Sequence, residues 1–274
     1  MFDLNTLPPL RDVIEEYDLR AKKSLGQNFL LDLNLTQKIV RNADDLSGVT
    51  VFEIGPGPGG LTRALLASNA KRVVAVEFDS RAVSALQDLV SLSEQRLEVI
   101  EKDALKADLA ALSPNGPRAI VANLPYNIAT PLLISWLKQI RADQNTYRSM
   151  TLMFQKEVAD RIMALPNTKS YGRLSVISQW LCHVKKVMDI SPSAFTPPPK
   201  VTSSVVHFEP KKLTDIEPSF RDVESVTEAA FGQRRKMIRS SLKAYSEKIE
   251  TLGLDPEQRA ENLEVHDFIK LAKD

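Results

Sequence analysis

The feature that most constrains the fold is a regular alternation of β-rich runs and helical stretches that begins near residue 50. Short apolar runs are separated by stretches in which apolar residues recur every three or four positions. This alternation is typical of a parallel sheet whose crossover connections are helices. We expect amphipathic crossover helices over Gly60 to Ser68 and Asp79 to Leu92. The predicted parallel strands are Thr50 to Ile54, Arg72 to Phe78, Leu97 to Lys102, Ala119 to Asn123 and Met150 to Phe154.

The second half of the chain departs from this alternation. After a predicted helix over Leu174 to Cys182, two further strands are expected at Val184 to Ile190 and Ser203 to Phe208. The segment Phe195 to Val201 between them contains three consecutive prolines and is predicted to be a rigid surface loop. From Pro210 onward the β pattern disappears. The helices predicted there are Asp222 to Phe231, Arg234 to Lys248 and Pro256 to Asn262.

These patterns predict an α/β fold in two parts. We expect a Rossmann-like domain at residues 1–209, with an N-terminal extension at 1–20, and a small all-helical C-terminal domain at residues 210–274; 274 residues suffice for both. The single Cys182 excludes an intrachain disulfide, and no Cys/His spacing suits a metal ion. Neither a signal peptide nor a membrane-spanning run is seen, so a cytoplasmic, monomeric protein without metal or membrane association is expected.

A glycine-rich turn follows the first predicted strand and leads into a helix. Gly55, Gly57 and Gly60 satisfy the dinucleotide spacing G-x-G-x-x-G, so a nicotinamide- or flavin-dependent enzyme has to be considered. Pyrophosphate, however, is held by backbone N–H groups at such a turn, and Pro56 and Pro58 remove two of them. A cofactor without phosphate, such as S-adenosylmethionine, loses nothing by this. The turn therefore favours S-adenosylmethionine.

Acidic residues follow the next two predicted strands. Glu77 ends the second strand, where a carboxylate can accept both ribose hydroxyls of an adenosine-containing cofactor. Asp103 follows the third strand and could bond the exocyclic amine of the cofactor adenine. Each acid alone could be a helix N-cap. Because open α/β sheets bind ligands at the carboxyl ends of their strands, the series as a whole predicts a cofactor site.

The fourth strand ends in Asn123, Leu124, Pro125 and Tyr126. The exocyclic amine of adenine is a poor nucleophile because its lone pair is delocalised into the ring. The Asn123 side-chain oxygen and the Leu124 carbonyl can each accept one N–H bond and hold the lone pair toward a methyl donor. Pro125 would fix the turn, and Tyr126 would stack on the extruded base. A simple strand-ending turn is the alternative interpretation.

The net charge of +1 does not indicate a nucleic-acid binder, so any RNA surface must come from local clustering. Residues 229 to 246 contain no acidic side chain. Within them Arg235, Arg239 and Lys243 recur every four residues, which predicts one basic stripe on a helix that suits phosphate contacts. A solvated helix face is the alternative. Arg20, Lys22 and Lys23 form a second, weaker cluster. The predicted RNA-binding residues are Arg234, Arg235, Lys236, Arg239 and Lys243.

With these motifs in place, the chain resembles the KsgA (RsmA) family of small-subunit ribosomal RNA adenine dimethyltransferases over nearly its whole length. The resemblance implies S-adenosylmethionine as cofactor. It also implies transfer of two methyl groups to N6 of each of two adjacent adenosines near the 3′ end of 16S rRNA, late in assembly of the small ribosomal subunit. The segments that carry it are Ser24 to Leu30, Glu53 to Gly57, Asn123 to Ile128, Phe195 to Ser203 and Phe231 to Lys236.

The resemblance also implies roles for particular residues. Phe195 would stack on the target base opposite Tyr126. Three other functions stay open: an adenine methyltransferase acting on large-subunit rRNA or DNA, a nicotinamide-dependent oxidoreductase, and a non-enzymatic assembly or transcription factor on the same fold. The implied cofactor contacts are Asn28, Leu30, Gly55, Glu77, Asp103 and Asn123.

Overall fold

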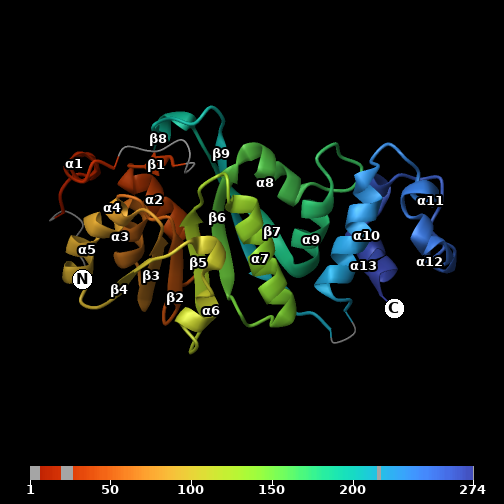
Figure 1. The fold of residues 1–274 in the computed structure, drawn as a ribbon, viewed down its shortest axis with the longest axis horizontal. Coiled ribbons are helices and arrows are strands. Elements are labelled where there is room, and N and C mark those ends of the chain that lie inside the picture. Colours follow the sequence, from red (N-terminus) through yellow and green to blue (C-terminus); the bar gives the residue numbers. More distant parts are fainter. Residues whose placement is uncertain (1–6, 20–26, 215–216, 274) are drawn as a thin grey trace.

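A seven-stranded sheet forms the centre of the molecule (Figure 1). The computed structural model describes residues 7–19, 27–214 and 217–273. The strand order is β4-β3-β2-β5-β6-β9-β7, in which the first five strands are parallel and β9 runs antiparallel to both of its neighbours. Every predicted strand is confirmed. Their bounds are β2 Thr50–Ile54, β3 Arg72–Glu77, β4 Leu97–Glu101, β5 Arg118–Asn123, β6 Ser149–Gln155, β7 Cys182–Ile190 and β9 Ser203–Pro210.

Helices cover both faces of this sheet, which explains why the parallel strands read as continuous apolar runs. Successive side chains point to opposite faces, so Phe52 and Ile54 belong to a core shared with α7, whereas Val51 packs with α2 and α3. The helices of this part of the chain are α2 Leu33–Arg41, α3 Gly60–Leu66, α4 Ser80–Ala85, α5 Gln87–Leu92, η3 Ala104–Lys106, α6 Leu109–Leu112, α7 Ala129–Ala142, α8 Lys156–Met163, α9 Arg173–Leu181 and η4 Pro192–Ala194.

The predicted helix over residues 79–92 is interrupted. It forms as α4 and α5, which meet at the fully buried Leu86. There the Leu86 N–H is shared between the carbonyls of Ala82 and Val83, at 3.1 and 3.3 Å. A shared bond of this kind tightens the last turn of a helix. The apolar periodicity thus predicts both helical segments but does not encode the break between them.

The C-terminal region is helical, and none of its described residues belongs to a strand after β9. The helix predicted over residues 222–231 is confirmed as α10, the one predicted over residues 256–262 forms only a short 3₁₀ turn at Ala260–Asn262, and the one predicted over residues 234–248 is wrong. The N–H groups of Ile238 and Arg239, which a continuous helix would bond to its own previous turn, donate instead to Gln258 and Pro256. The segment breaks into short pieces. The elements are α10 Phe220–Gly232, α11 Ile238–Ser241, η5 Lys243–Tyr245, α12 Ser246–Thr251, η6 Ala260–Asn262 and α13 Val265–Ala272.

Aromatic side chains join the C-terminal helices to the sheet. Trp180 of α9 lies 6.3 Å from Phe220 of α10, and Phe231 lies between Tyr171 and Phe268, at 5.9 and 5.4 Å between ring centroids. All five belong to one apolar core with the sheet residues. The change from strands to helices falls at the predicted position near residue 210, and the division into two domains stays a prediction. Figure 1 shows these helices at the end of the molecule opposite β4.

The described part of the N-terminal extension contains a helix, α1 (Leu10–Glu16), whose Leu10 and Val13 are buried. The buried Arg63 of α3 donates to the Pro8 carbonyl at 2.7 Å, which ties this segment to the sheet domain. Farther along, β1 (Phe29–Leu30) pairs with β8 (Phe195–Thr196). The cluster of Arg20, Lys22 and Lys23 lies outside the described residues. Within the described ranges, no helix is long and apolar enough to span a membrane.

Candidate active site

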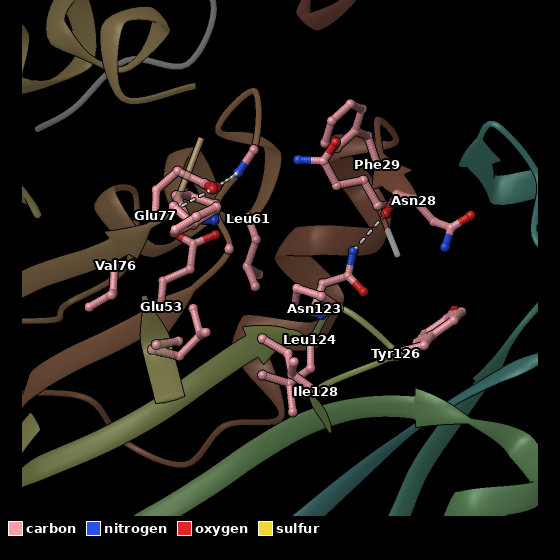
Figure 2. A pocket seen from close by; sticks show the side chains of 18 of the residues that line it. Asn28, Phe29, Glu53, Leu61, Val76, Glu77, Asn123, Leu124, Tyr126 and Ile128 are labelled. Atoms are coloured by element: carbon pink, nitrogen blue, oxygen red, sulfur yellow. Dashed lines mark hydrogen bonds between the residues drawn. The ribbon is translucent and has the colours of Figure 1, made fainter. Parts of the chain in front are cut away.

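The carboxyl ends of β2, β3 and β5 surround one pocket of about 270 Å³ (Figure 2). The strand order reverses between β2 and β5, which is where open α/β sheets bind their ligands. Three polar side chains at these strand ends point to the same face of the sheet: Glu53, Glu77 and Asn123. This follows from the strand register, because side chains alternate between the two faces along each strand. The structure thus brings together all of the predicted cofactor residues, which line this pocket: Asn28, Leu30, Gly55, Glu77, Asp103 and Asn123.

The backbone N–H groups of the glycine-rich turn all donate to acceptors within the protein. Positions 56 and 58 are prolines and have none. The backbone from residue 55 to residue 59 therefore has no spare donor for a pyrophosphate, which strengthens the argument against a dinucleotide. The three available N–H groups donate within the protein, Gly55 to Val76 at 3.0 Å, Gly57 to Glu77 at 3.2 Å and Gly59 to Pro56 at 3.0 Å.

The same turn packs tightly against the segment that carries Asn28. Gly57 has a φ of +54°, and a Cβ there would lie 2.7 Å from the Phe29 ring. A Cβ on Gly60 would lie 2.5 Å from the Leu30 carbonyl oxygen. Only glycine tolerates both the positive φ and the close approach at position 57. The two segments together form a cradle of backbone around the pocket.

Glu77 is held in place by the backbone. Its carboxylate, in a residue only 6% exposed, accepts N–H bonds from Gly57, Phe78 and Asp79 at 3.2, 2.7 and 2.9 Å. Burial raises the pKa of Glu77, and the three N–H bonds act against that rise. Phe78 and Asp79 both donate to Oε1, whereas Oε2 accepts only from Gly57 and keeps a lone pair that can accept a hydroxyl donor from a ligand.

The residues at the end of β5 form the other side of the pocket. The Asn123 amide nitrogen donates to the Asn28 carbonyl at 3.0 Å. Because a carbonyl only accepts, the nitrogen must occupy this position, and the Asn123 oxygen then faces away from it, on the side of Tyr126 (Figure 2). The half-buried Tyr126 exchanges a hydrogen bond with Ser203, which fixes its ring. Leu124 and Pro125 also line the pocket.

Three lining residues were not identified from the sequence. Phe78 and Leu105 are 64% and 49% exposed, although large apolar side chains are normally buried. Glu53 is a carboxylate inside an apolar strand and is 1% exposed. Burial raises the pKa of Glu53 to about 8. An acidic residue within the run Thr50–Ile54 was the signal that could have identified it.

The expected position of Phe195 requires a correction. Its ring is 3% exposed, packs in the core beside Leu30, and is not among the residues that line the pocket. Leu30 and Phe195 are partners in the β1–β8 pairing, so in this structure Phe195 supports the segment that carries Asn28. Stacking on a base would require the ring to leave this packing, and that role stays a prediction.

The basic C-terminal segment, residues 234–243, also differs from the expectation. Its residues do not form one helical stripe, because the helix is broken. Arg234 pairs with Glu261 and Arg239 with Glu257, both at 3.1 Å. The remaining three are exposed and form no ion pair with any described residue: Arg235, Lys236 and Lys243.

Comparison with known proteins identifies the family. Residues 18–274 match the family described as ribosomal RNA adenine dimethylase. The chain belongs to this family. It is 54% identical over 274 residues to ribosomal RNA small subunit methyltransferase A of Rhizobium etli, covering 99% of each chain. The predicted fold class and the assignment as a methyltransferase are thereby confirmed.

Two solved structures have the same fold along most of the chain. A dimethyladenosine transferase from Plasmodium falciparum is 29% identical, with a TM-score of 0.74, covering 88% of this chain and 94% of that one. The 23S rRNA methyltransferase ErmE is 26% identical, with a TM-score of 0.68, covering 89% of this chain and 98% of that one. The second similarity means that the fold alone does not identify the ribosomal subunit on which a member acts.

Proposed function

We propose that the protein transfers methyl groups from S-adenosylmethionine to N6 of two adjacent adenosines near the 3′ end of 16S rRNA, during late assembly of the small ribosomal subunit. Family membership and the full-length similarity to a small-subunit enzyme support the target. The observation that carries the chemistry is the Asn123 amide, whose nitrogen donates to Asn28 and whose oxygen is thereby left to accept from an N–H donor of a ligand. Ribosomal subunits as substrate imply a cytoplasmic protein.

The pocket fits S-adenosylmethionine, which supplies an electrophilic methyl group on a positively charged sulfur. Glu77 would accept from the ribose through the remaining lone pair of Oε2, and the turn at Gly57 lies directly against the Phe29 ring, where any Cβ would collide. Asp103, whose side chain is 34% exposed, is placed to accept from the adenine amine. Phe78 and Leu105 offer apolar surface to the adenine ring, which explains their exposure before the ligand binds.

For the transfer itself, the protein's task is to orient the target amine. The Asn123 oxygen and the Leu124 carbonyl would accept its two N–H bonds and direct the nitrogen lone pair toward the methyl carbon. Tyr126, held by Ser203, would stack on the extruded base. The N–C bond would form as the S–C bond breaks and leaves a neutral sulfur, and the methylated amine would then lose one proton to solvent. Because the proton leaves after the attack, no general base has to act first.

The exposed residues of the basic C-terminal segment support an RNA contact away from the pocket. Arg235, Lys236 and Lys243 are free of ion pairs with the described residues, so phosphates could pair with them without breaking internal contacts. Figure 1 shows α11 at the far end of the molecule from β4. A structured RNA, rather than a single nucleotide, is the kind of substrate that could occupy both places.

The decisive test offers labelled S-adenosylmethionine to the purified protein with unmodified small subunits, mature small subunits, large subunits and DNA. We expect label only in unmodified small subunits, recovered as dimethyladenosine. Label in large-subunit RNA or in DNA would transfer the assignment to that substrate. No label in any of the four would leave a non-catalytic role in assembly as the better explanation.

A further inference from the structure

Glu53 differs from the other two carboxylates of the pocket. Glu77 accepts three backbone N–H bonds, and Asp103 is partly exposed and accepts from the Leu105 N–H. Glu53 is 1% exposed, and its Oε2 has no hydrogen-bond partner among the described residues. Hydrogen bonds from the Thr62 side chain and backbone lower the pKa of Glu53, but burial outweighs them, and an unpartnered buried oxygen makes the carboxylate costly to keep charged. Since the proposed transfer gives Glu53 no task, its position in the pocket requires another explanation.

The charges around Glu53 do not neutralise it. On β3 its neighbour is another carboxylate, Glu77, whose charge raises the pKa of Glu53 further. Beyond β4 the pocket is lined by one cation, Lys102, and one anion, Asp103. On α3, Arg63 donates to the Pro8 carbonyl. β5 lines the pocket with uncharged residues, and α2 exposes its charged side chains to solvent. The described lining therefore has an excess of negative charge.

The methyl donor and the product left after transfer differ in charge. Both contain the same adenosine and the same amino acid group, but S-adenosylmethionine has a positive sulfur and S-adenosylhomocysteine a neutral one. A buried anion that lies near the sulfur distinguishes two ligands that differ by one charge, to a degree set by the distance between the two charges. Resting on the proposed function, we propose that Glu53 makes the pocket charge-selective, so that the protein binds the methyl donor more tightly than the product and releases the product after transfer.

A pH dependence follows from the burial of Glu53. With a pKa of about 8 in the free protein, Glu53 is mostly protonated at neutral pH. A bound cation favours the ionised form and lowers that pKa, so binding of the donor releases a proton. Affinity for the donor should rise with pH until Glu53 is ionised in the free protein, and then level off. Affinity for the neutral product should lack this rise.

The test is titration calorimetry of the wild type and Glu53→Gln with both ligands at about pH 6.5 and about pH 9, on either side of the titration of Glu53. In the wild type, the ratio of donor to product affinity should increase about tenfold with pH, the effect of one partly screened charge pair. In Glu53→Gln the ratio should be low and independent of pH, with product affinity unchanged. Buffers of different ionisation enthalpy should show proton release for the wild type with the donor only.

A matched variant and a conservative one complete the design. Asp103→Asn should weaken both ligands alike, because both contain the adenine it contacts, and Glu53→Asp should retain the preference for the donor. Equal weakening of both ligands by Glu53→Gln, or a wild-type ratio that does not change with pH, would overturn the proposal. The wild-type pH series decides the matter even if Glu53→Gln does not fold. A wild type that binds neither ligand would instead contradict the proposed function.

Discussion

The pocket at the strand ends and the basic C-terminal segment present their polar side chains in opposite ways. In the pocket, side chains are buried and fixed by backbone bonds, as for Glu77 with its three N–H donors and Asn123 with Asn28. In the basic segment, the residues available to a partner are exposed and form no ion pair with the described residues. Changes in the pocket should therefore have large and specific effects, and changes in the basic segment small and additive ones.

The largest effect is expected for Asn123→Ala. Loss of one acceptor aimed at the reacting amine should slow methyl transfer by about 100- to 1,000-fold. Cofactor binding should fall less, because the Glu77 side of the pocket is untouched. Single-turnover rates and calorimetric affinity measure the two effects separately. Asn115→Ala, an exposed asparagine before the same strand, is the control, and turnover equal to wild type in Asn123→Ala would remove the assigned role.

Gly57→Ala tests whether the cradle matters as much as the polar groups. Its Cβ would meet the Phe29 ring at 2.7 Å, whereas Gly48, with a φ of +74°, has no atom within 4 Å of that position. Both alanine variants should lose about 1–2 kcal/mol of stability from the positive φ. Only Gly57→Ala should also lose cofactor affinity, by about tenfold, which is ~1.4 kcal/mol. Equal affinity in the two variants would show that the Phe29 contact is unimportant.

In the basic segment, Arg235→Ala and Lys236→Ala should each weaken binding to the small subunit only a few-fold. Each should also lower the slope of log affinity against log salt by about one, since each residue replaces about one counterion. Thermal stability and cofactor affinity should match the wild type. Lys71→Ala, another exposed lysine, is the control, and an unchanged salt slope in all three variants would exclude the phosphate contacts.

The smallest effect on binding is expected for Arg234→Ala. Arg234 is 40% exposed and pairs with Glu261, and its Nη2 also donates to the Thr168 carbonyl. Its loss should cost stability, by roughly 0.5–1 kcal/mol after solvent screening of the ion pair. Chemical denaturation measures this change. A salt slope lowered as much as in Arg235→Ala would show that the two arginines are equivalent, contrary to the structure.

The sequence predicted most of the fold and most of the pocket, because both follow from the alternation of strands and helices. In a parallel sheet, groups at strand ends such as Glu77, Asp103 and Asn123 must converge. The helix predicted over residues 234–248 failed because Ile238 and Arg239 donate to residues about 20 positions away, contacts that periodicity does not encode. The buried position of Phe195 was missed for a similar reason, since its burial depends on pairing with Leu30.

The core that joins the C-terminal helices to the sheet has a consequence for how a target is chosen. The ring pairs Trp180–Phe220 and Phe231–Phe268 belong to one apolar cluster that joins both parts, so a hinge between them is not expected. The distance between the RNA contact at Lys236 and the pocket at Tyr126 should then stay constant. An RNA bound at Lys236 would place in the pocket only the nucleotide that its own folding holds at that distance. The target would then be selected by the shape of the RNA rather than by its base sequence.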